Sequence, residues 1–448
     1  MKRFVLTIIL IGVVAFVGVL SFALWPTATR QIATIEPVDA ALVEKGRYLA
    51  VAADCSACHT SPGGAAFAGD LAIASPIGTI YTPNITPDPT TGIGGYSLDD
   101  FDRAVRHGIS PRGLTLYPAM PYPSYARMTD DDVVALYAYF TKDVAAVKHR
   151  RRAAEIPWPL SIRWPLAIWR KSFAPDVDAV AFDPKRYTDP TVARGAYLMQ
   201  GPGHCGACHT PRGLALQEEA LDESGTAYLS GGQVIDGWFA VNLRGDPADG
   251  LGGWTPDDIV ATLRSARNTT HAVIGSAMSD VVVHSTQYMT DADLRAMAMY
   301  LKSLSPAATS PAAFTGDPTM ASALASGQES SRGAQLYVDN CAACHRTDGK
   351  GIARIFPEIA GNSSVLAVDP TSMIRLILQG SQLPGTEAAP SNLGMPGFAW
   401  RLSDAEVAQL TTFIRQSWGN HAGAVDSGLV EVIRSTTVRE REGAGRQR

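Results

Sequence analysis

The chain has 448 residues, of which 46% are hydrophobic and 18% are charged, and its formal net charge is −5. This length allows two to four domains, and the composition is that of an ordinary folded protein. Nothing in this weakly acidic balance indicates binding to nucleic acid, and we expect no nucleic-acid partner.

The N-terminal segment has the composition of a membrane anchor. An uncharged apolar run from Phe4 to Trp25 follows two basic residues and is long enough to cross a bilayer as a helix. The basic residues predict a cytoplasmic N-terminus and export of everything that follows. A cleaved signal peptide is the alternative, but its apolar core is normally shorter, and Pro26–Arg30 makes a poor cleavage site. We therefore expect residues 1–30 to be an anchor or signal segment, with an uncleaved anchor favoured.

Three copies of the pattern C-x-x-C-H follow along the chain. They are Cys55-Ser-Ala-Cys58-His59, Cys205-Gly-Ala-Cys208-His209 and Cys341-Ala-Ala-Cys344-His345. In the attachment of c-type haem, the two thiols add to the vinyl groups of the porphyrin, and the adjacent histidine offers a ring nitrogen to the iron. Disulfides or a zinc site built from paired motifs are alternatives, but neither needs a histidine after each second cysteine. All six cysteines lie in these motifs, so the sequence predicts three covalently bound haem c groups.

The motifs and the composition between them predict the domain organisation. The expected segments are 1–30 as the anchor or signal segment, 37–148 as domain 1, 149–183 as a Trp/Pro-rich linker, 184–304 as domain 2, 305–325 as a second linker, 326–421 as domain 3 and 422–448 as a disordered tail. Because covalent haem is attached outside the cytoplasm, we expect these domains in the periplasm or on the outer face of a membrane.

The first linker combines a basic run at Arg150–Arg152 with three tryptophans interleaved with prolines, Trp158, Trp164 and Trp169. This composition predicts a segment that crosses a surface rather than a flexible tether. The tryptophans have three possible roles, which are packing between domains, docking of a partner subunit and a place at the membrane interface.

The three domains share features beyond their haem motifs. A basic residue and a glycine precede the motifs at Lys45-Gly46, Arg194-Gly195 and Arg332-Gly333. The last helices begin at the capping pairs Thr129/Asp132, Thr290/Asp293 and Ser403/Glu406, and an aromatic follows each cap by ten residues, at Tyr139, Tyr300 and Phe413. A glycine in the first helix and an aromatic in the last suit two helices that cross closely.

Domains 1 and 2 also share loop residues at an offset of 158, such as Asn84 and Asn242. The repeat predicts an all-α fold with three tandem class I cytochrome c domains preceded by one N-terminal transmembrane helix. Such small domains have little core of their own, and the buried porphyrin would supply much of it.

An iron that carries electrons without binding substrate needs a sixth ligand, and methionine is the usual choice in cytochromes c. The candidates in the three domains are Met120 and Met128, Met278 and Met289, and Met373 and Met395. Met128 and Met289 directly precede the capping threonines, where domain 3 has Leu402, so this position is better explained as a hydrophobic staple.

Three of the other candidates, Met120, Met278 and Met395, agree with the repeat. Met120 and Met278 lie 158 positions apart, and Met120-Pro121 corresponds to Met395-Pro396. The predicted axial pairs are therefore His59 with Met120, His209 with Met278 and His345 with Met395.

Coordination by two histidines is the alternative, with His107 or His271 as donors, but domain 3 has no counterpart. His204 is expected to form a local hydrogen bond, and Met297 and Met299 are expected to lie in a helix core.

The chain resembles the triple-haem cytochrome c subunit of bacterial membrane-bound dehydrogenases, a family that includes the subunits of alcohol, gluconate, sorbitol and fructose dehydrogenases. The resemblance is carried by Tyr117-Pro-Ala-Met-Pro-Tyr-Pro-Ser-Tyr125, by Gly203–Gly213 and by Met395–Glu406. In that family a separate catalytic subunit oxidises the substrate, and the cytochrome passes electrons to ubiquinone in the membrane. The family commonly carries a cleavable signal peptide, which departs from the anchor expected here.

The resemblance implies an electron-transfer subunit that is not an enzyme on its own. Its implied partners are a quinoprotein, flavoprotein or molybdenum dehydrogenase as donor and ubiquinone or a terminal oxidase as acceptor. Its implied location is the inner membrane, with the haem domains on the periplasmic side. The alternatives are a catalytic multihaem enzyme (a peroxidase or a sulfur-compound dehydrogenase) and a freestanding periplasmic electron carrier. Three methionine candidates argue against an open catalytic iron, and the anchor and the Trp-rich linker favour a complex.

Overall fold

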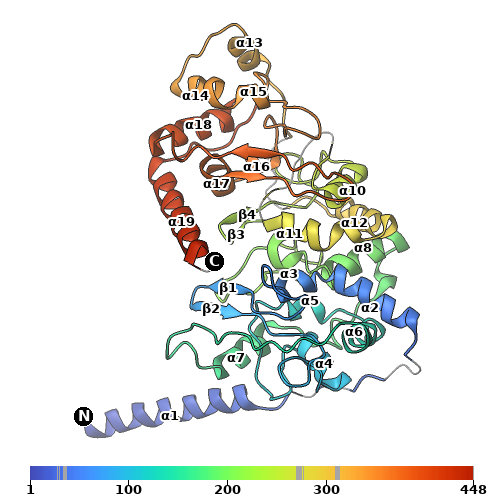
Figure 1. Ribbon diagram of the computed structural model, residues 1–448. Coiled ribbons are helices and arrows are strands. Elements are labelled where there is room, and N and C mark those ends of the chain that lie inside the picture. Colours follow the sequence, from blue (N-terminus) through green and yellow to red (C-terminus); the bar gives the residue numbers. More distant parts are fainter. Residues whose placement is uncertain are drawn as a thin grey trace. The chain divides into compact units, whose positions relative to one another are not determined.

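The computed structural model describes residues 1–448 apart from 28, 30, 34–37, 269–274, 276, 308–312 and 447–448 (Figure 1). The chain forms two compact units. The first comprises Met1–Asp183 with Gln200–His204, and the second comprises Pro184–Met199 with Cys205–Arg448. The second unit thus contains the second and third haem motifs together. The finer division into three domains stays a prediction.

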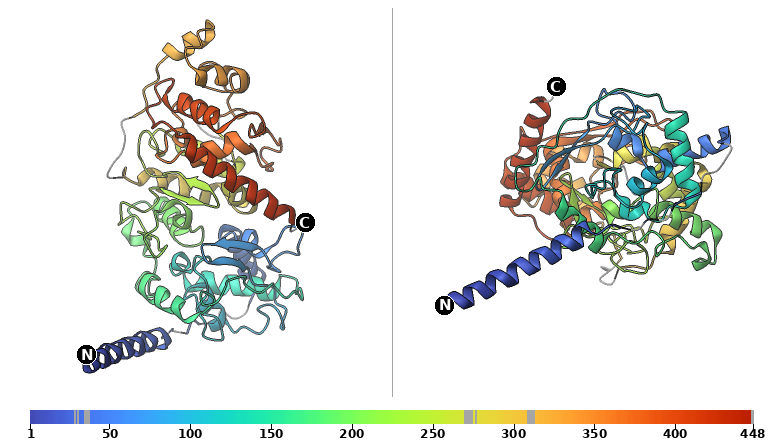
Figure 2. Two further views of the ribbon diagram at one scale, coloured as in Figure 1. Left: turned by 90° about the vertical axis from the view of Figure 1, so that its left-hand side faces the viewer. Right: turned by 90° about the horizontal axis from the view of Figure 1, so that it is seen from below.

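The first unit consists of seven described helices and one hairpin. In chain order they are α1 (Lys2–Leu24), α2 (Ala40–Ala52), α3 (Cys55–His59), β1 (Ala72–Ser75), β2 (Gly78–Tyr81), α4 (Leu98–Val105), α5 (Tyr122–Tyr125), α6 (Asp130–Lys142) and α7 (Trp164–Phe173). Helix α1 extends away from the rest of this unit as one straight helix (Figures 1 and 2).

The second unit begins with η1 (Pro184–Arg186), and its described elements fall around the second and third motifs. The second motif lies among α8 (Pro190–Gln200), α9 (Gly206–His209), β3 (Gln233–Ile235), β4 (Trp238–Ala240), α10 (Pro256–Ser265), α11 (Ala277–His284), η2 (Thr286–Tyr288) and α12 (Asp291–Ser303). The third lies among α13 (Thr319–Ala325), α14 (Arg332–Asn340), α15 (Ala342–His345), α16 (Ser363–Leu366), α17 (Thr371–Gln379), β5 (Gly380–Gln382), β6 (Gly394–Pro396), α18 (Asp404–Gln416) and α19 (Ser427–Arg446).

A close helix crossing recurs at each of the three motifs. The first helix of each repeat (α2, α8 or α14) meets the last (α6, α12 or α18) at the glycine noted in the sequence. A Cβ atom added to the glycine would lie 2.7 Å from Tyr139 Cβ for Gly46, 2.8 Å from Tyr300 Cβ for Gly195 and 2.6 Å from Phe413 Cβ for Gly333. The expectation that glycine and aromatic mark a close crossing is therefore confirmed.

Each crossing is also joined by an ion pair that the sequence did not reveal. The basic residue before the glycine reaches the acidic residue of the cap: Lys45 to Asp132 at 2.6 Å, Arg194 to Asp293 at 2.8 Å and Arg332 to Glu406 at 2.6 Å. The three caps form as predicted, because the side chains of Thr129, Thr290 and Ser403 accept hydrogen bonds from the third backbone N–H of their helices.

In the part of the chain that the structure describes, three short hairpins add strands to a mainly helical fold, so the all-α prediction is too simple. The antiparallel pairs are β1–β2, β3–β4 and β5–β6. They lie in the long Gly/Pro-rich loops between the haem motif and the last helix, where strand pairing satisfies backbone groups that no helix would bond. The third hairpin carries a predicted ligand, because Met395 is paired with Ser381 across it.

The C-terminal residues form a helix, so the predicted disordered tail is wrong. Helix α19 has 20 residues and packs on α17 and α18 (Figure 2). Val430 and Ile433 are buried on its inner face. Arg434 Nε donates to Asp404 Oδ1 at 2.7 Å. The apolar spacing at i and i+3 was the available signal, and the charged residues near the end of the chain obscured it.

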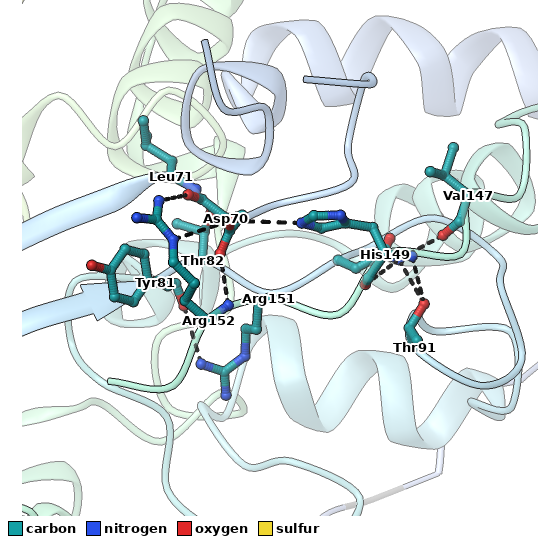
Figure 3. A network of polar contacts seen from close by, with 10 residues as sticks. Asp70, Leu71, Tyr81, Thr82, Thr91, Val147, His149, Arg151 and Arg152 are labelled. Atoms are coloured by element: carbon teal, nitrogen blue, oxygen red, sulfur yellow. Dashed lines mark hydrogen bonds and ion pairs between the residues drawn. The ribbon is translucent and has the colours of Figure 1, made fainter. Parts of the chain in front are cut away.

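The start of the Trp-rich linker is fixed to the first unit by a polar network around Asp70 (Figure 3). The backbone N–H of Arg152 donates to Asp70 Oδ1 at 2.7 Å, and the Arg152 guanidinium lies 4.1 Å above the ring of Tyr81. Arg151 donates to the Tyr81 carbonyl at 3.2 Å, and His149 Nε2 lies 3.7 Å from Asp70 Oδ2. The basic run is therefore part of the folded unit and not a free tether.

The helix crossing predicts the effect of one added methyl group. In an exposed helix interior, replacing glycine by alanine normally stabilises by up to about 1 kcal/mol. At Gly46 the new Cβ would collide with the Ala135 carbonyl and with Tyr139. We expect Gly46→Ala to lower the free energy of unfolding by about 1–3 kcal/mol. Denaturant unfolding of the haem-loaded protein, followed by circular dichroism, measures this.

Gly95→Ala is the matched control, because a Cβ at Gly95 would have no neighbour within 4 Å. Its effect should stay within about 0.5 kcal/mol. Equal stability of the two variants would contradict the close crossing.

Candidate haem-binding sites

The three motif histidines share one hydrogen-bond arrangement. Each Nδ1 lies within hydrogen-bonding distance of a backbone carbonyl oxygen: His59 with Pro83 at 2.9 Å, His209 with Val241 at 2.8 Å and His345 with Pro357 at 3.0 Å. A carbonyl can only accept, so Nδ1 carries the proton in this arrangement and Nε2 keeps its lone pair. Metal-binding histidines are commonly oriented in this way.

Local backbone bonds and burial complete this arrangement. The carbonyls of the three histidines accept N–H groups from Gly69 (2.7 Å), Gly231 (2.7 Å) and Gly351 (3.1 Å). Burial lowers the pKa of His59, His209 and His345, because desolvation disfavours the imidazolium form. Neutral imidazole is the form that binds iron.

The six motif cysteines form no disulfide, so the structure does not bear out the disulfide alternative. Burial raises the pKa of Cys55, Cys205 and Cys341 to about 12, so these thiols stay protonated at neutral pH. No group of three or more His, Cys, Asp and Glu side chains converges within the described ranges, and the zinc alternative finds no ligand set there.

The three methionines predicted as ligands are partly exposed. Met120 and Cys55 both pack against the core cluster of the first unit. Met395 packs against the cluster that contains Cys341, and it lines an open cavity of about 600 Å³ with Gln379–Gln382. Met278 lies in the first turn of α11 and is half-buried.

The methionines assigned to the staple position are fully buried. Met128 is 2% exposed, Met289 is 3% exposed, and Leu402, their counterpart, is 5% exposed. All three lie directly before a helix cap, as the staple interpretation expects. Their burial supports the choice of the other methionines, although the ligand set itself stays a prediction.

Comparison with known proteins agrees with this geometry. The cytochrome c family model matches residues 43–142 and 330–418, which hold the first and third motifs. The gluconate 2-dehydrogenase cytochrome c subunit of Pantoea cypripedii is 53% identical over 408 residues, which are 90% of this chain and 92% of that protein. The cytochrome c subunit of a quinone alcohol dehydrogenase from Gluconacetobacter polyoxogenes is also 53% identical, over 91% of this chain and 87% of its own length.

The chain belongs to this family of dehydrogenase cytochrome c subunits. The fructose dehydrogenase cytochrome subunit of Gluconobacter japonicus, another relative, is 36% identical over 88% of this chain and 82% of that protein. Cytochrome c domains bind haem c covalently, and the cysteines outside disulfides and the oriented histidines fit that group.

The alternative ligands of this cytochrome subunit have other surroundings. His107 Nε2 lies 3.6 Å from Asp102 Oδ2. His271 lies outside the described residues. The ring of His204 packs edge-on to that of Tyr125 at 5.6 Å, and burial lowers its pKa. The contact of His107 with Asp102 is local, and His204, which is not a candidate ligand, forms a hydrogen bond with the Ala53 backbone, as expected.

One contact near a predicted ligand had no signal in the sequence. The guanidinium of Arg163, just before α7, lies 4.0 Å above the ring of Tyr117, three residues before Met120. Arg163 also donates to the Thr115 carbonyl. The Trp-rich linker therefore contacts and stabilises the loop that carries Met120 through Arg163, and not through its tryptophans alone.

The ligand assignment predicts the outcome of a matched pair of substitutions. Met395→Leu should leave haem attached through Cys341 and Cys344, because thioether formation does not involve the sixth ligand. The iron would lose its sulfur donor, and the potential of that haem should fall. Absorption spectra and redox titration of the purified protein measure both effects.

Met289→Leu is the control, because Met289 is buried in the staple position, and its spectrum should not change. The same contrast applies to Met120→Leu and Met128→Leu. Loss of a low-spin signal in Met128→Leu but not in Met120→Leu would contradict the assignment.

Proposed function

We propose that this cytochrome subunit carries three haem c groups and relays electrons from the catalytic subunit of a dehydrogenase to ubiquinone or another acceptor of the respiratory chain. The observation that carries the proposal is the threefold arrangement of a histidine whose Nδ1 faces a carbonyl, which leaves the lone pair on Nε2, beside two cysteines that form no disulfide. The relatives support the donor, because their names join this kind of chain to gluconate, alcohol and fructose dehydrogenases.

Each residue type has its own part in holding the cofactor. The cysteines would bind the porphyrin covalently, the histidine would take one axial position of the iron, and Met120, Met278 or Met395 would take the other. Haem supplies reversible one-electron chemistry when bound. An iron with both axial positions filled offers none to a substrate, which favours a relay over the catalytic alternative.

Within the second unit, the segments that carry Met278 and Met395 contact each other. A Cβ added to Gly275, three residues before Met278, would lie 2.5 Å from Ser381 Oγ. Ser381 is the strand partner of Met395. The Arg267 guanidinium donates to the Ser391 carbonyl at 2.8 Å, which fixes the same two segments. This contact suits the passage of electrons between the second and third haems.

Attachment to the membrane through α1 is part of the proposal. The helix Arg3–Leu24 is long and apolar enough to span a bilayer, and its side chains other than that of Ala23 are not buried. Helix α7 packs on it: the rings of Phe16 and Trp164 meet edge-on at 6.2 Å, and Lys171 Nζ donates to the carbonyls of Phe22 and Trp25, each at 2.6 Å. Lys171 of α7 therefore supplies hydrogen bonds to backbone carbonyls at the C-terminal end of α1, where a helix has no partners of its own for them.

The basic residues at the start of α1 predict a cytoplasmic N-terminus, which would place the haem-bearing units on the periplasmic side of the inner membrane. The contacts with α7 would hold the linker tryptophans near the membrane surface. They also favour retention of α1, because cleavage would remove the partners of Trp164 and Lys171. A mature N-terminus between Thr27 and Ala40, found by mass spectrometry, would contradict this.

The relay predicts how the isolated subunit behaves. Without its partner it should show no oxidase, peroxidase or dehydrogenase turnover, while a chemical donor should reduce every haem. Adding the catalytic subunit, whether a quinoprotein, flavoprotein or molybdenum enzyme, should let its substrate reduce the haems, and a quinone analogue should reoxidise them. Stopped-flow absorption spectroscopy follows both steps.

The matched experiment in cells is deletion of the gene. The dehydrogenase should remain folded but unable to feed respiration. Substrate turnover by the isolated cytochrome would favour the catalytic alternative, and unchanged substrate-dependent respiration in the deletion strain would favour a freestanding carrier.

A further inference from the structure

The loop after the second motif folds back onto the haem-attachment helix α9. Arg212 and Glu218 face each other as an isolated antiparallel bridge, and the Glu219 N–H donates to the Pro211 carbonyl at 3.0 Å. The Arg212 guanidinium donates to the carbonyls of Ala207 at 2.5 Å and Leu216 at 2.9 Å. The loop therefore closes over the residues between the two haem-binding cysteines.

This closure places the Glu218 carboxylate against the motif. A Cβ added to Gly206, between Cys205 and Cys208, would lie 2.7 Å from Glu218 Oε2 and 3.0 Å from the ring of Tyr228. Only glycine leaves this space for the carboxylate. The residue as a whole is partly exposed, but Oε2 is buried and has no hydrogen-bond partner among the described residues. The hydroxyl of Tyr228 is buried in the same way.

The charges around Glu218 leave the carboxylate poorly compensated. Arg212 is the cation that acts on it, yet the Arg212 N–H groups are directed to the two carbonyls. Burial raises the pKa of Glu218 to about 7 despite Arg212. Four other titratable groups surround this cluster. Cys205 and Cys208 become thioethers when haem is attached, Glu223 accepts hydrogen bonds from Tyr187 and Tyr300, and Asp236 acts electrostatically on Cys208.

We propose that Glu218 is a proton-binding site coupled to the redox state of the second haem, taking up one proton when that iron is reduced. The inference rests on the proposed function, because it assumes a haem attached at Cys205 and Cys208. In the balanced step, ferric iron gains one electron from the donor subunit, and the Glu218 carboxylate gains one proton from solvent to become a carboxylic acid. Reoxidation of the iron releases both.

The coupling follows from electrostatics in a buried site. Reduction removes one positive charge near the carboxylate, so the ionised form loses stabilisation and the proton affinity rises. By reciprocity, a bound proton raises the potential of the haem by the same free energy. Each tenfold change in proton affinity corresponds to about 59 mV in a one-electron couple.

A redox titration of the full-length haem-loaded protein in detergent, without its partner and from about pH 5 to about pH 9, tests this. Around neutral pH the potential of one haem should fall as pH rises, by up to about 59 mV per pH unit. The slope should flatten at low pH, where the carboxyl group is protonated in both redox states, and at high pH, where it is ionised in both.

Glu218→Gln should abolish the slope, while Glu219→Gln, at the exposed neighbouring position, should retain it. Infrared difference spectra of the unmodified protein at neutral pH should show a protonated-carboxyl band on reduction, which keeps the test independent of how the variant folds. A slope that persists in Glu218→Gln, or the absence of both slope and band, would overturn the proposal. These equilibrium measurements need no catalytic partner, so their failure is distinct from failure of the relay.

Discussion

The crossing of two helices at a glycine determines where every haem-attachment segment lies. The first helix of each repeat leads into the C-x-x-C-H segment within a few residues, so its position on the last helix positions both thiols and the histidine. The close approach is possible only because Gly46, Gly195 and Gly333 have no side chain. The ion pair beside each glycine then joins the two helices at their polar edge. The rest of each repeat, which is loop with short helices and one strand pair, packs around these two helices.

The loops, in turn, orient the ligands. A carbonyl from the loop after each motif receives the histidine Nδ1, and the loops also carry Met120 and Met395 on segments that pack at the edges of the two cores. The loops contain little regular structure, and their own backbone bonds and short hairpins hold them. Haem attachment would therefore connect a helical frame and a loop that otherwise share a small core, which links cofactor binding to stability.

Features that recur at a fixed spacing could be predicted from the sequence. Contacts that depend on how closely two segments approach each other in the fold could not. The motifs, caps and crossing glycines repeat, and they could be found by alignment of the chain with itself. The ion pair of Lys45 with Asp132 could not be found in this way, because it depends on the angle at which α2 meets α6. Glu218 had no signal, since a carboxylate in a loop with the acidic neighbours Glu219, Asp222 and Glu223 is usually solvated. The spacing of Val430 and Ile433 is typical of the buried face of a helix, but the charged residues that follow favoured the prediction of a disordered tail.

The central claim is that all three motifs carry covalent haem, because a relay with a missing member would leave its neighbours unconnected. The mass of the intact, denatured protein purified from cells that attach haem tests this most directly, since thioether-bound haem survives denaturation and loosely bound haem does not. The account predicts a mass that exceeds that of the polypeptide by three haem groups. A mass with two haems or fewer in fully matured protein would contradict it.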